Sequence, residues 1–508
     1  MTHLFGKFFK KSTETFNTAT LLDDSSEKFN SSSTPVYFSH KTRLILCRYM
    51  PLVAILCFLT WSVTCLRSDF SRDDADPEIL NQTWRMARGL DIYRDINAPP
   101  FAFAAYPPLY FMISAFALKF TGLSFLPARL TSFAAAISIA WAMAYLSRKW
   151  GKSGCVGLWA ASLLFLIPAF LYNSARCHPQ MMAVAFSILS FAAFLQNRRR
   201  YTLVLSPLLA LLAIYTKQTQ IVLPLAMVLY LVFRNRKWLL PYISILAIGG
   251  LIPFLWLQKI TGGYFYSNII TYAGNLSYDA LTIIPVFLHH AGPLFIFIGI
   301  ALSLLWKRFK SREWEEIDFY LLVVFLFTLF SLGRLGAHGQ YVVELLAVVL
   351  IFLLRMPVSF KTAGKNIWVS VQILLLLVQA PLFILLEEGY PNRAANRAYH
   401  EIYQIIKSSP GGPILSQQGS FPLFTRGEIY IQLFHFTGLY RAGIWDQKHL
   451  LDAIENRTFP YVITEFPVTE SNGGADERER FTPEIIESLK ANYKFMKEVY
   501  PYYIYRPN

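Results

Sequence analysis

The stretch LILCRYMPLVAILCFLTWSVTCLRSDFSRDDADPEIL, residues 44–80, joins a membrane-length apolar run to a cluster of acidic residues. About 20 apolar residues span the hydrocarbon core of a bilayer, so 44–66 predicts a helix that anchors the chain in a membrane. The acids that follow at once are Asp73, Asp74, Asp76 and Glu78. Because ionisable groups at the edge of a membrane commonly mark a site, we expect chemistry at this junction.

The remainder of the chain has the composition of a polytopic membrane protein. Of its 508 residues, 54% are hydrophobic and 16% aromatic, whereas only 16% are charged. Further apolar runs lie near residues 128–147, 155–172, 179–196, 239–257, 283–306, 317–332, 340–355 and 366–386, and two shorter runs lie at 203–216 and 219–234. Together with 44–66 they predict an all-α protein with about 11 transmembrane helices.

The net charge of +15 would suggest nucleic acid as the partner of a soluble protein. Here the basic residues fall in short loops between apolar runs, at 148–152, 198–200, 234–237, 307–312 and 355–365. Loops rich in Lys and Arg mark the cytoplasmic side of a membrane protein. Orientation in the bilayer therefore explains the charge, and we expect membrane lipids rather than nucleic acid as partners.

The same basic clusters bear on the apolar residues 105–120. If this segment crossed the bilayer, the cluster at 148–152 would lie outside and every later cluster would change sides. With 105–120 in the interface, all five clusters share one side. We therefore predict a disordered cytoplasmic tail at 1–43, a first outer loop at 67–127 and an extracytoplasmic C-terminus.

The C-terminal part, 389–508, alternates as soluble domains do. Helix-like YHEIYQIIKSS and TPEIIESLKANY enclose strand-like PILSQQ and PYVITEF. This order predicts a small α/β domain on the outer side, after a membrane domain at 44–388. We expect the domain to act as a lid or docking module.

The predicted topology gathers unusual polar residues at the outer face. Lys217 interrupts two short apolar runs in YTKQTQ, which predicts a broken helix that lines a cavity; a Lys that snorkels to the headgroups is the alternative. Arg176 could instead be an anchor at the membrane interface. Arg334 could instead form an ion pair with Glu344. For the acids, the alternative is a cap on the helix suggested by ILNQTWRMARGL.

The order of the motifs resembles the GT-C membrane glycosyltransferases that use polyprenyl-phosphate sugars. The similarity is to the branch of the protein O-mannosyltransferases and the lipid A aminoarabinose transferases. After the acidic motif come MARGLDIYRD, AYPPLYF, SFLPARLTSFAAA, SARCHPQMMA, YTKQTQIVLP and GAHGQYVVELLAVVL, over roughly residues 70–506. One departure is His178, two residues after Arg176, where members of the branch often carry Asp.

This resemblance implies an inverting hexosyl- or pentosyltransferase of cell-envelope glycan synthesis in the inner or plasma membrane. It would move a sugar from a polyprenyl phosphate to the hydroxyl of a lipid, glycan or protein acceptor on the outer face. Some relatives use a divalent metal and others do not, so the cofactor stays open, as does the sugar. The implied catalytic acids are Asp76, which is favoured, then Asp74 and Glu78; the implied donor-phosphate ligands are Arg176, Lys217 and Arg334; the implied substrate contacts are His178, Gln218, His338 and Tyr341.

Other functional classes stay open at this point. A transporter or flippase of lipid-linked glycans would also place cations at membrane depth, although such proteins usually show internal repeats and none is visible here. A polymerase or ligase would use the same lipid-carrier donor with a longer acceptor. A non-catalytic scaffold would have no need of the acids that follow the first apolar run.

Overall fold

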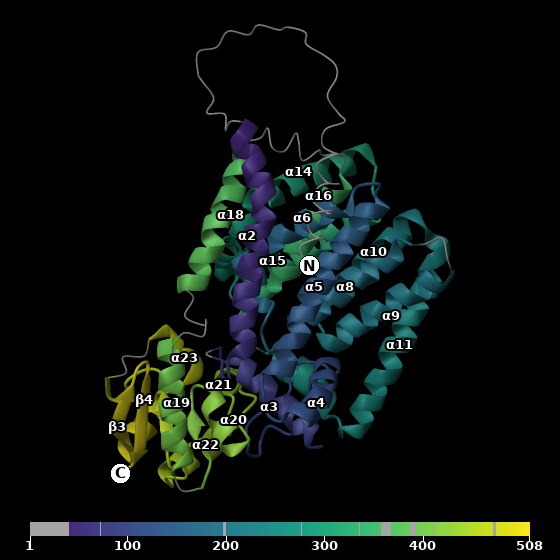
Figure 1. Ribbon diagram of the computed structural model, residues 1–508. Coiled ribbons are helices and arrows are strands. Elements are labelled where there is room, and N and C mark those ends of the chain that lie inside the picture. The colour runs from purple at the N-terminus through teal and green to yellow at the C-terminus, as the bar shows by residue number, and fades with distance from the viewer. Residues whose placement is uncertain are drawn as a thin grey trace, which may run out of the picture. The chain divides into compact units, whose positions relative to one another are not determined.

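The computed structural model describes residues 40–508 apart from 72, 197–199, 276, 335, 357–366, 387–392, 410 and 471–473. The predicted tail at 1–43 therefore lies outside the described residues up to residue 39. Within the described chain, helices predominate and a small sheet lies near the C-terminus, so the predicted fold class is confirmed (Figure 1).

The predicted apolar runs form the helices of the membrane domain. These are α2 (His40–Arg67), α5 (Leu126–Lys149), α6 (Gly154–Leu164), α7 (Pro168–Asn173), α8 (Gln180–Phe194), α9 (Arg200–Thr216), α10 (Val222–Arg234), α11 (Leu239–Ile260), α13 (Ile283–Ala291), α14 (Phe295–Ser311), α15 (Glu316–Leu332), α16 (Val343–Arg355) and α18 (Ile367–Leu386). Short helical turns connect them: η1 (Arg236–Trp238), α12 (Tyr264–Tyr266), η2 (Ser267–Tyr272), η3 (Ala280–Thr282), η4 (Gly292–Leu294) and η5 (Gly339–Tyr341).

Five helical segments in the described chain are long and apolar enough to cross a membrane. They cover 49–67, 126–149, 236–260, 280–311 and 368–386. Further apolar helices are shorter, among them α9 and α10, the two that flank Lys217. The count of eleven crossings stays a prediction, although each predicted run is helical.

Two helices of residues 67–127, the segment predicted to be the first outer loop, lie at the end of the bundle that meets the C-terminal domain (Figure 1). They are α3 (Ala75–Ala87) and α4 (Leu109–Thr121). With 13 residues, α4 is about 20 Å long, less than the ~30 Å of a hydrocarbon core. This length fits the predicted interfacial position of 105–120, which itself stays a prediction.

Small residues let the central helices of the bundle approach closely. Helix α6 packs on α5, and a Cβ atom on Gly157 would lie 2.4 Å from the carbonyl oxygen of Met143 and 2.6 Å from the Cα of Ala144. Because these neighbours are backbone atoms, they cannot move aside as a side chain can. Gly157 therefore sets the distance between the two helices.

The C-terminal domain has the predicted alternation of helices and strands. Its sheet has the order β1-β2-β4-β3, in which β1 runs parallel to β2 and the other neighbours are antiparallel. The strands are β1 (Leu415–Ser416), β2 (Val462–Thr464), β3 (Tyr493–Val499) and β4 (Tyr502–Pro507), and the helices are α19 (Arg393–Lys407), α20 (Ser420–Arg426), α21 (Leu433–Arg441), α22 (Lys448–Glu455), η6 (Val468–Glu470), α23 (Ala475–Arg480) and α24 (Pro483–Asn492).

The predicted first outer loop packs against this domain. The N–H of Phe101 donates to the carbonyl of Tyr430 at 2.6 Å, and the N–H of Gln432 donates to the carbonyl of Phe101 at 3.0 Å. The Phe101 ring is fully buried against Phe436 and Trp445. Backbone bonds and a shared apolar core thus fix the loop to the domain.

Substituting Gly157 tests the close approach of α5 and α6. Gly157→Ala is expected to lower the free energy of unfolding by about 1–3 kcal/mol, because its methyl group would overlap backbone atoms of α5. Gly154→Ala is the matched control, since the three atoms nearest to a Cβ there belong to the flexible side chain of Arg148. Thermal unfolding in detergent measures both variants, and equal melting temperatures would contradict the packing.

Candidate active site

The carboxylates at the start of α3 point to two sides. Asp73 and Asp76, three residues apart, both contact Arg176 of the membrane domain. Asp74 and Glu78, four residues apart, both contact the C-terminal domain, through Arg480 and His435 respectively. Residues three or four apart share a helix face, so the local sequence creates two separate acidic faces.

Arg176 is held by the acidic face that Asp73 and Asp76 form. Its Nε lies 3.1 Å from Oδ1 of Asp76, its Nη2 pairs with Asp73, and its guanidinium lies 4.8 Å from the centre of the Tyr172 ring. The Tyr172 hydroxyl donates to Asp73 at 2.6 Å. Arg176 is thus a paired cation rather than only an interfacial anchor.

Asp76 is buried, with 2% of its surface exposed. Its Oδ2 accepts bonds from the Ser71 hydroxyl at 3.1 Å and the Cys177 N–H at 3.3 Å. Asp73 instead caps α3, because its Oδ1 accepts the N–H groups of Ala75 and Asp76 at 2.9 and 3.3 Å. The capping alternative therefore holds for Asp73 and not for Asp74, whose side chain makes no capping bond.

The pKa values of Asp73 and Asp76 shift in opposite directions, although both carboxyls contact Arg176. Burial opposes the ionised form of Asp73, but Arg176, the Tyr172 hydroxyl and two backbone N–H groups outweigh it and hold the pKa of Asp73 below its usual value. Burial dominates at Asp76 and raises its pKa, against the pull of Arg176. Asp73 is therefore the firmer counter-ion of Arg176.

A second cation, Lys217, lies in a buried polar cluster with 1% of its surface exposed. Its Nζ donates to Oε1 of Gln180 at 2.5 Å and lies 4.7 Å from the centre of the Tyr341 ring and 5.6 Å from that of Tyr106. Among the described residues, no carboxylate lies within ion-pair distance of this ammonium. Its charge is thus met by a neutral amide and two aromatic faces.

His178 shares two neighbours, Gln180 and Tyr106, with Lys217. Its Nδ1 accepts the N–H of Gln180 at 3.2 Å, which leaves the proton of a neutral ring on Nε2, 3.1 Å from the Tyr106 hydroxyl. Since Tyr106 also lies beside Lys217, the structure brings Arg176, His178, Lys217 and Tyr341 of the predicted set together.

The other predicted contacts lie apart from this hydrogen-bonded cluster. Arg334 donates to the carbonyls of Ala273 and Gly274 at 2.8 and 3.3 Å. His338 is exposed, and its ring centre lies 6.4 Å from that of His290. Glu344 accepts a hydrogen bond from the Tyr320 hydroxyl at 2.6 Å. Arg334 and Glu344 thus have different partners and do not form the alternative ion pair.

Gln218 joins two loops through its side-chain amide. Its Nε2 donates to the carbonyls of Ala105 and Ile269, at 2.9 and 3.0 Å. Its buried Oε1 has no hydrogen-bond partner in the described chain. Gln218 therefore holds the YTKQTQ break against the first outer loop, next to Lys217.

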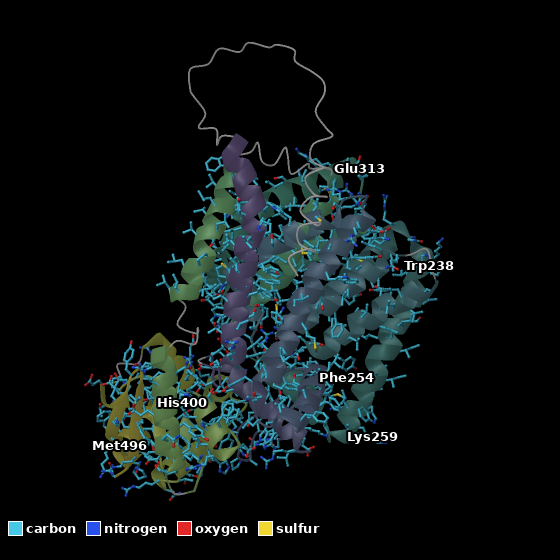
Figure 2. The ribbon with its side chains drawn as sticks, viewed as in Figure 1. Trp238, Phe254, Lys259, Glu313, His400 and Met496 are labelled. Carbon is cyan, nitrogen blue, oxygen red and sulfur yellow. The ribbon has the colours of Figure 1, made fainter. Side chains whose placement is uncertain are left out.

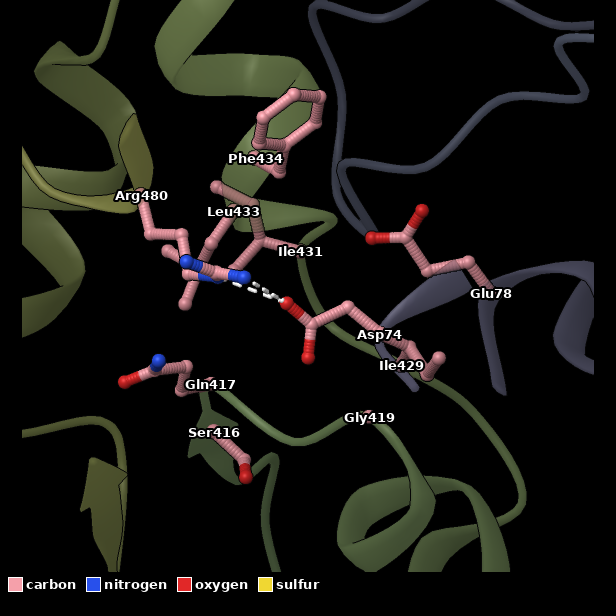
Figure 3. Close-up of a pocket in the computed structure, with 10 residues that line it drawn as sticks. All are labelled: Asp74, Glu78, Ser416, Gln417, Gly419, Ile429, Ile431, Leu433, Phe434 and Arg480. Carbon is pink, nitrogen blue, oxygen red and sulfur yellow. Dashed lines mark hydrogen bonds and ion pairs between the residues drawn. The ribbon is translucent and has the colours of Figure 1, made fainter. Parts of the chain in front are cut away.

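The other acidic face, formed by Asp74 and Glu78, borders a pocket whose remaining walls belong to the C-terminal domain (Figure 3). Oδ2 of Asp74 lies 2.5 and 2.8 Å from Nη2 and Nε of Arg480, and Glu78 lies 3.1 Å from Nδ1 of His435. Its walls are Asp74, Glu78, Ser416, Gln417, Gly419, Ile429, Ile431, Leu433, Phe434 and Arg480. The domain thus supplies chemical groups as well as cover.

Asp74 is a pocket-lining carboxyl that is suited to proton transfer. Burial raises its pKa to about 7, although the adjacent Arg480 guanidinium lowers it. About a quarter of its side chain, 26%, stays exposed. The group is therefore both reachable and poised near neutral pH.

Sequence reasoning missed several partners of these residues. Arg480 and His435 lie in a domain for which no catalytic groups were expected, and Tyr172 and Gln180 are common residues in apolar surroundings. Another is Arg129, whose guanidinium donates to the carbonyls of Cys65, Ser68 and Phe70 at 2.6, 2.7 and 3.0 Å. Only its place in SFLPARLTSFAAA, a quoted motif, could have drawn attention to it.

The described residues contain no group of three His, Cys, Asp or Glu side chains placed to hold a metal ion. Asp73 and Asp76 share one cation, the guanidinium of Arg176. The donor set seen here is thus an arginine-bridged pair of carboxylates.

Comparison with known proteins agrees with this architecture. Residues 105–258 match the family model described as dolichyl-phosphate-mannose-protein mannosyltransferase. Among curated proteins, none matches the chain significantly by sequence.

Solved structures resemble the chain over most of its length. ArnT from Cupriavidus metallidurans in the apo state has 15% identity and a TM-score of 0.61, covering 92% of this chain and 98% of that one. The same protein bound to undecaprenyl phosphate gives 14% identity and a TM-score of 0.59, with coverages of 92% and 98%. The apo oligosaccharyltransferase of Archaeoglobus fulgidus gives 11% identity and a TM-score of 0.56, covering 91% of this chain and 74% of that one. The chain is therefore a membrane protein with the fold of the GT-C glycosyltransferases, and residues 105–258 carry its match to the protein mannosyltransferase family.

Proposed function

We propose that the protein is an inverting glycosyltransferase that moves one sugar from a polyprenyl phosphate to an acceptor hydroxyl on the outer side of the membrane. The observation that carries this proposal is the buried cation cluster of Arg176 and Lys217 beside the acids that begin α3. The similar ArnT structure bound to undecaprenyl phosphate supports the donor class. The family description makes polyprenyl-phosphate mannose the first donor to test.

Lys217 is the main ligand that we assign to the donor phosphate. Its ammonium is buried and faces a neutral amide and two aromatic rings, so an incoming phosphate would be its first anionic neighbour within ion-pair distance. Arg176 supports it from beside His178, already neutralised by Asp73 and Asp76. Preorganised cations of this kind stabilise the charge that builds on the phosphate as the glycosidic bond breaks.

We assign the general base to Asp74. The family resemblance favours Asp76, but Asp76 is buried with its oxygens bonded to Arg176, Ser71 and the Cys177 N–H, whereas Asp74 lines the pocket. Asp76 and Asp73 then serve to position Arg176. Glu78, the third predicted acid, lines the same pocket as Asp74.

The reaction follows from these positions. The acceptor oxygen attacks the anomeric carbon from the face opposite the phosphate, and its proton passes to Asp74. The bond between the anomeric carbon and the phosphate oxygen breaks, and its electron pair leaves with the polyprenyl phosphate beside Lys217. A single displacement without a protein nucleophile inverts the anomeric centre.

We place the N-terminus in the cytoplasm and the C-terminal domain on the outer side of the inner or plasma membrane. Glu313, which follows the basic cluster 307–312, lies at the end of the bundle opposite His400 and Met496 of the C-terminal domain (Figure 2). The positive-inside tendency of such clusters supports this orientation.

Glycosyl transfer from radiolabelled polyprenyl-phosphate sugars tests the reaction and its base. Asp74→Asn is expected to lower kcat by about 10²–10⁴-fold with little change in the donor KM, because it removes proton transfer and not donor binding. Asp76→Asn is expected to raise the donor KM, since Arg176 loses a positioning contact.

Asp91→Asn serves as the control for that assay, because Asp91 is an exposed acid of the same loop. Full activity of Asp74→Asn would refute the assignment of the base. Absence of transfer by the native protein with every donor would favour the transporter class instead.

The pH profile tests the same assignment independently. Because only the carboxylate form of Asp74 can take a proton, kcat/KM is expected to rise as the pH rises through about 7 and to level off above it. An Asp with an ordinary pKa would give this rise near pH 4. Removing the charge that lowers this pKa, in Arg480→Gln, should move the rise to higher pH; an unchanged midpoint would exclude Asp74.

Replacing Lys217 tests the donor site. Lys217→Gln is expected to reduce kcat/KM by about 10²–10³-fold, the loss typical of one preorganised electrostatic contact. Lys259→Gln, at the exposed end of α11, is the matched control (Figure 2). Melting temperatures of both variants separate loss of catalysis from loss of folding, and normal kinetics in a folded Lys217→Gln protein would rule out this role.

A further inference from the structure

A row of buried hydrogen bonds runs through the membrane domain beside Lys217. The Ser187 hydroxyl of α8 donates to Oε1 of Gln220 at 2.8 Å, and the Gln220 side chain is hydrogen-bonded in turn to Glu344 of α16. From α15, the Tyr320 hydroxyl donates to Oε1 of Glu344 at 2.6 Å. None of these four side chains is more than 5% exposed, so the row is shielded from water. It ties the break between α9 and α10 to three other helices.

Glu344 is the acceptor at the centre of this row. It lies in the first turn of α16, where the helix dipole favours a carboxylate. Because Oε1 of Gln220 already accepts the Ser187 hydroxyl, the Gln220 amide meets Glu344 as a donor. Two donors thus satisfy a carboxyl group that burial alone would penalise.

The same row reaches the turn that carries Lys217. The N–H of Gln220 donates to the carbonyl of Lys217 at 3.0 Å, so the two residues belong to one turn. On the facing segment, Tyr341 and Glu344 are also three residues apart. The Lys217 ammonium lies 4.7 Å from the centre of the Tyr341 ring, while Gln220 is bonded to Glu344. Two parallel contacts therefore join the helix break to the start of α16.

Lys217 depends on such contacts for its position. Its ammonium faces the neutral amide of Gln180 and two aromatic rings, and its long stem is flexible. A lysine held in this way can turn towards the headgroups if the backbone that carries it shifts. The position of the turn therefore decides whether the ammonium stays in the buried cluster.

Building on the proposed transfer reaction, we propose that Gln220 and Glu344 are positioning residues of the donor site. Their hydrogen bond clamps the turn of residues 217–220 against α16 and thereby holds the Lys217 ammonium where the donor phosphate binds. Neither residue touches the substrate in this proposal, and both act through Lys217.

The hydrogen bond, rather than the charge of Glu344, is the contribution that favours phosphate binding. The field of Glu344 reaches the Lys217 ammonium. The same negative charge would also repel a phosphate that approaches this ammonium. Geometry is therefore the benefit that a carboxyl group can bring to a phosphate site from this distance.

Binding of undecaprenyl phosphate tests the clamp without any need for sugar transfer. The full-length protein in phosphatidylcholine nanodiscs is titrated with this lipid, and the rise in melting temperature gives an apparent Kd. Undecaprenol, the same lipid without the phosphate, is the control ligand. We expect the phosphate to stabilise the native protein and the alcohol not to; equal effects of the two lipids would contradict both the clamp and the role of Lys217.

Two variants break the row without changing any charge. Gln220→Leu is expected to raise the Kd about tenfold or more, because a displacement of about 1 Å is costly for a preorganised group. Ser187→Ala frees only one end of Gln220 and should give a smaller rise. Ser190→Ala is the matched control, since its hydroxyl donates to the carbonyl of Ser206 at 2.7 Å, one turn along the same helix.

Melting temperatures without ligand show which of these variants are folded. A folded Gln220→Leu protein with the Kd of the native protein would exclude the clamp. If Gln220→Leu does not fold, Ser187→Ala decides, and equal Kd values for Ser187→Ala and Ser190→Ala would exclude it as well.

Substitutions of Glu344 separate the hydrogen bond from the charge. Glu344→Leu removes both and is expected to weaken binding as much as Gln220→Leu does. Glu344→Gln removes only the charge, and its amide oxygen can still accept from Gln220, so it should restore most of the affinity lost in Glu344→Leu. Equal losses in the two Glu344 variants would assign the effect to the charge and refute the clamp.

A double-mutant cycle tests whether the clamp acts through Lys217. Lys217→Gln alone should weaken binding of the phosphate, and adding Gln220→Leu to it should cause no further loss. Losses that add in the double variant would show that Gln220 acts on the phosphate independently of Lys217, which would overturn the proposal.

Sugar transfer distinguishes this inference from the proposed function. Clamp-dependent binding of undecaprenyl phosphate, in a protein that transfers no sugar from any donor, would keep the positioning role and refute the glycosyltransferase reaction. Transfer that is equally efficient in the native protein and in Gln220→Leu would keep the reaction and refute the positioning role.

Discussion

The salt bridge of Arg176 with Asp73 and Asp76 is the interaction on which the site depends. Charges removed from water must be paired, and this cation lies where the loop after α7 meets the start of α3. The same contact therefore fixes the position of the first outer loop and the spacing of its acids. Arg129 fixes the preceding segment by binding three carbonyls between Cys65 and Phe70. Two buried arginines thus fix the segment that joins α2 to α3.

The start of α3 separates two environments within a few residues. One face of it meets the buried cations of the membrane domain, and the other meets the pocket of the C-terminal domain. A lipid-borne phosphate and a hydroxyl acceptor would approach from these different sides. Such an arrangement suits a displacement in which the nucleophile and the leaving group must lie on opposite faces of one carbon.

Much of the fold could be predicted because its signals are local. Apolar runs of helical length and the alternation from Tyr399 to Tyr493 depend on neighbouring residues alone, and the structure has helices and strands there. The number of crossings is harder to predict, because α9 and α10 are shorter than a bilayer is thick. The acidic run was also found, but its sorting into a cap, a buried partner and a pocket residue depends on tertiary contacts.

The partners of the site could not be predicted for the same reason. Nothing near Arg480 in the sequence shows that it meets Asp74, and Gln180 has no local feature that points to Lys217. Such pairs exist only once the chain has folded. The motif order predicted Arg176, Lys217, His178, Arg334 and His338 as site residues. The structure brings the first three close together, and Arg334 and His338 lie outside that cluster.

The core shared by Phe101 and the C-terminal domain has a consequence for biosynthesis. Ile96, Phe101 and Phe103 of the first outer loop are buried among side chains that include Phe436 and Trp445. A ribosome delivers the loop long before it delivers those partners, and all the remaining membrane helices are made in between. The loop therefore lacks the partners of its apolar side chains until the end of the chain has been made, so maturation of the acidic site is among the last events in the assembly of the protein.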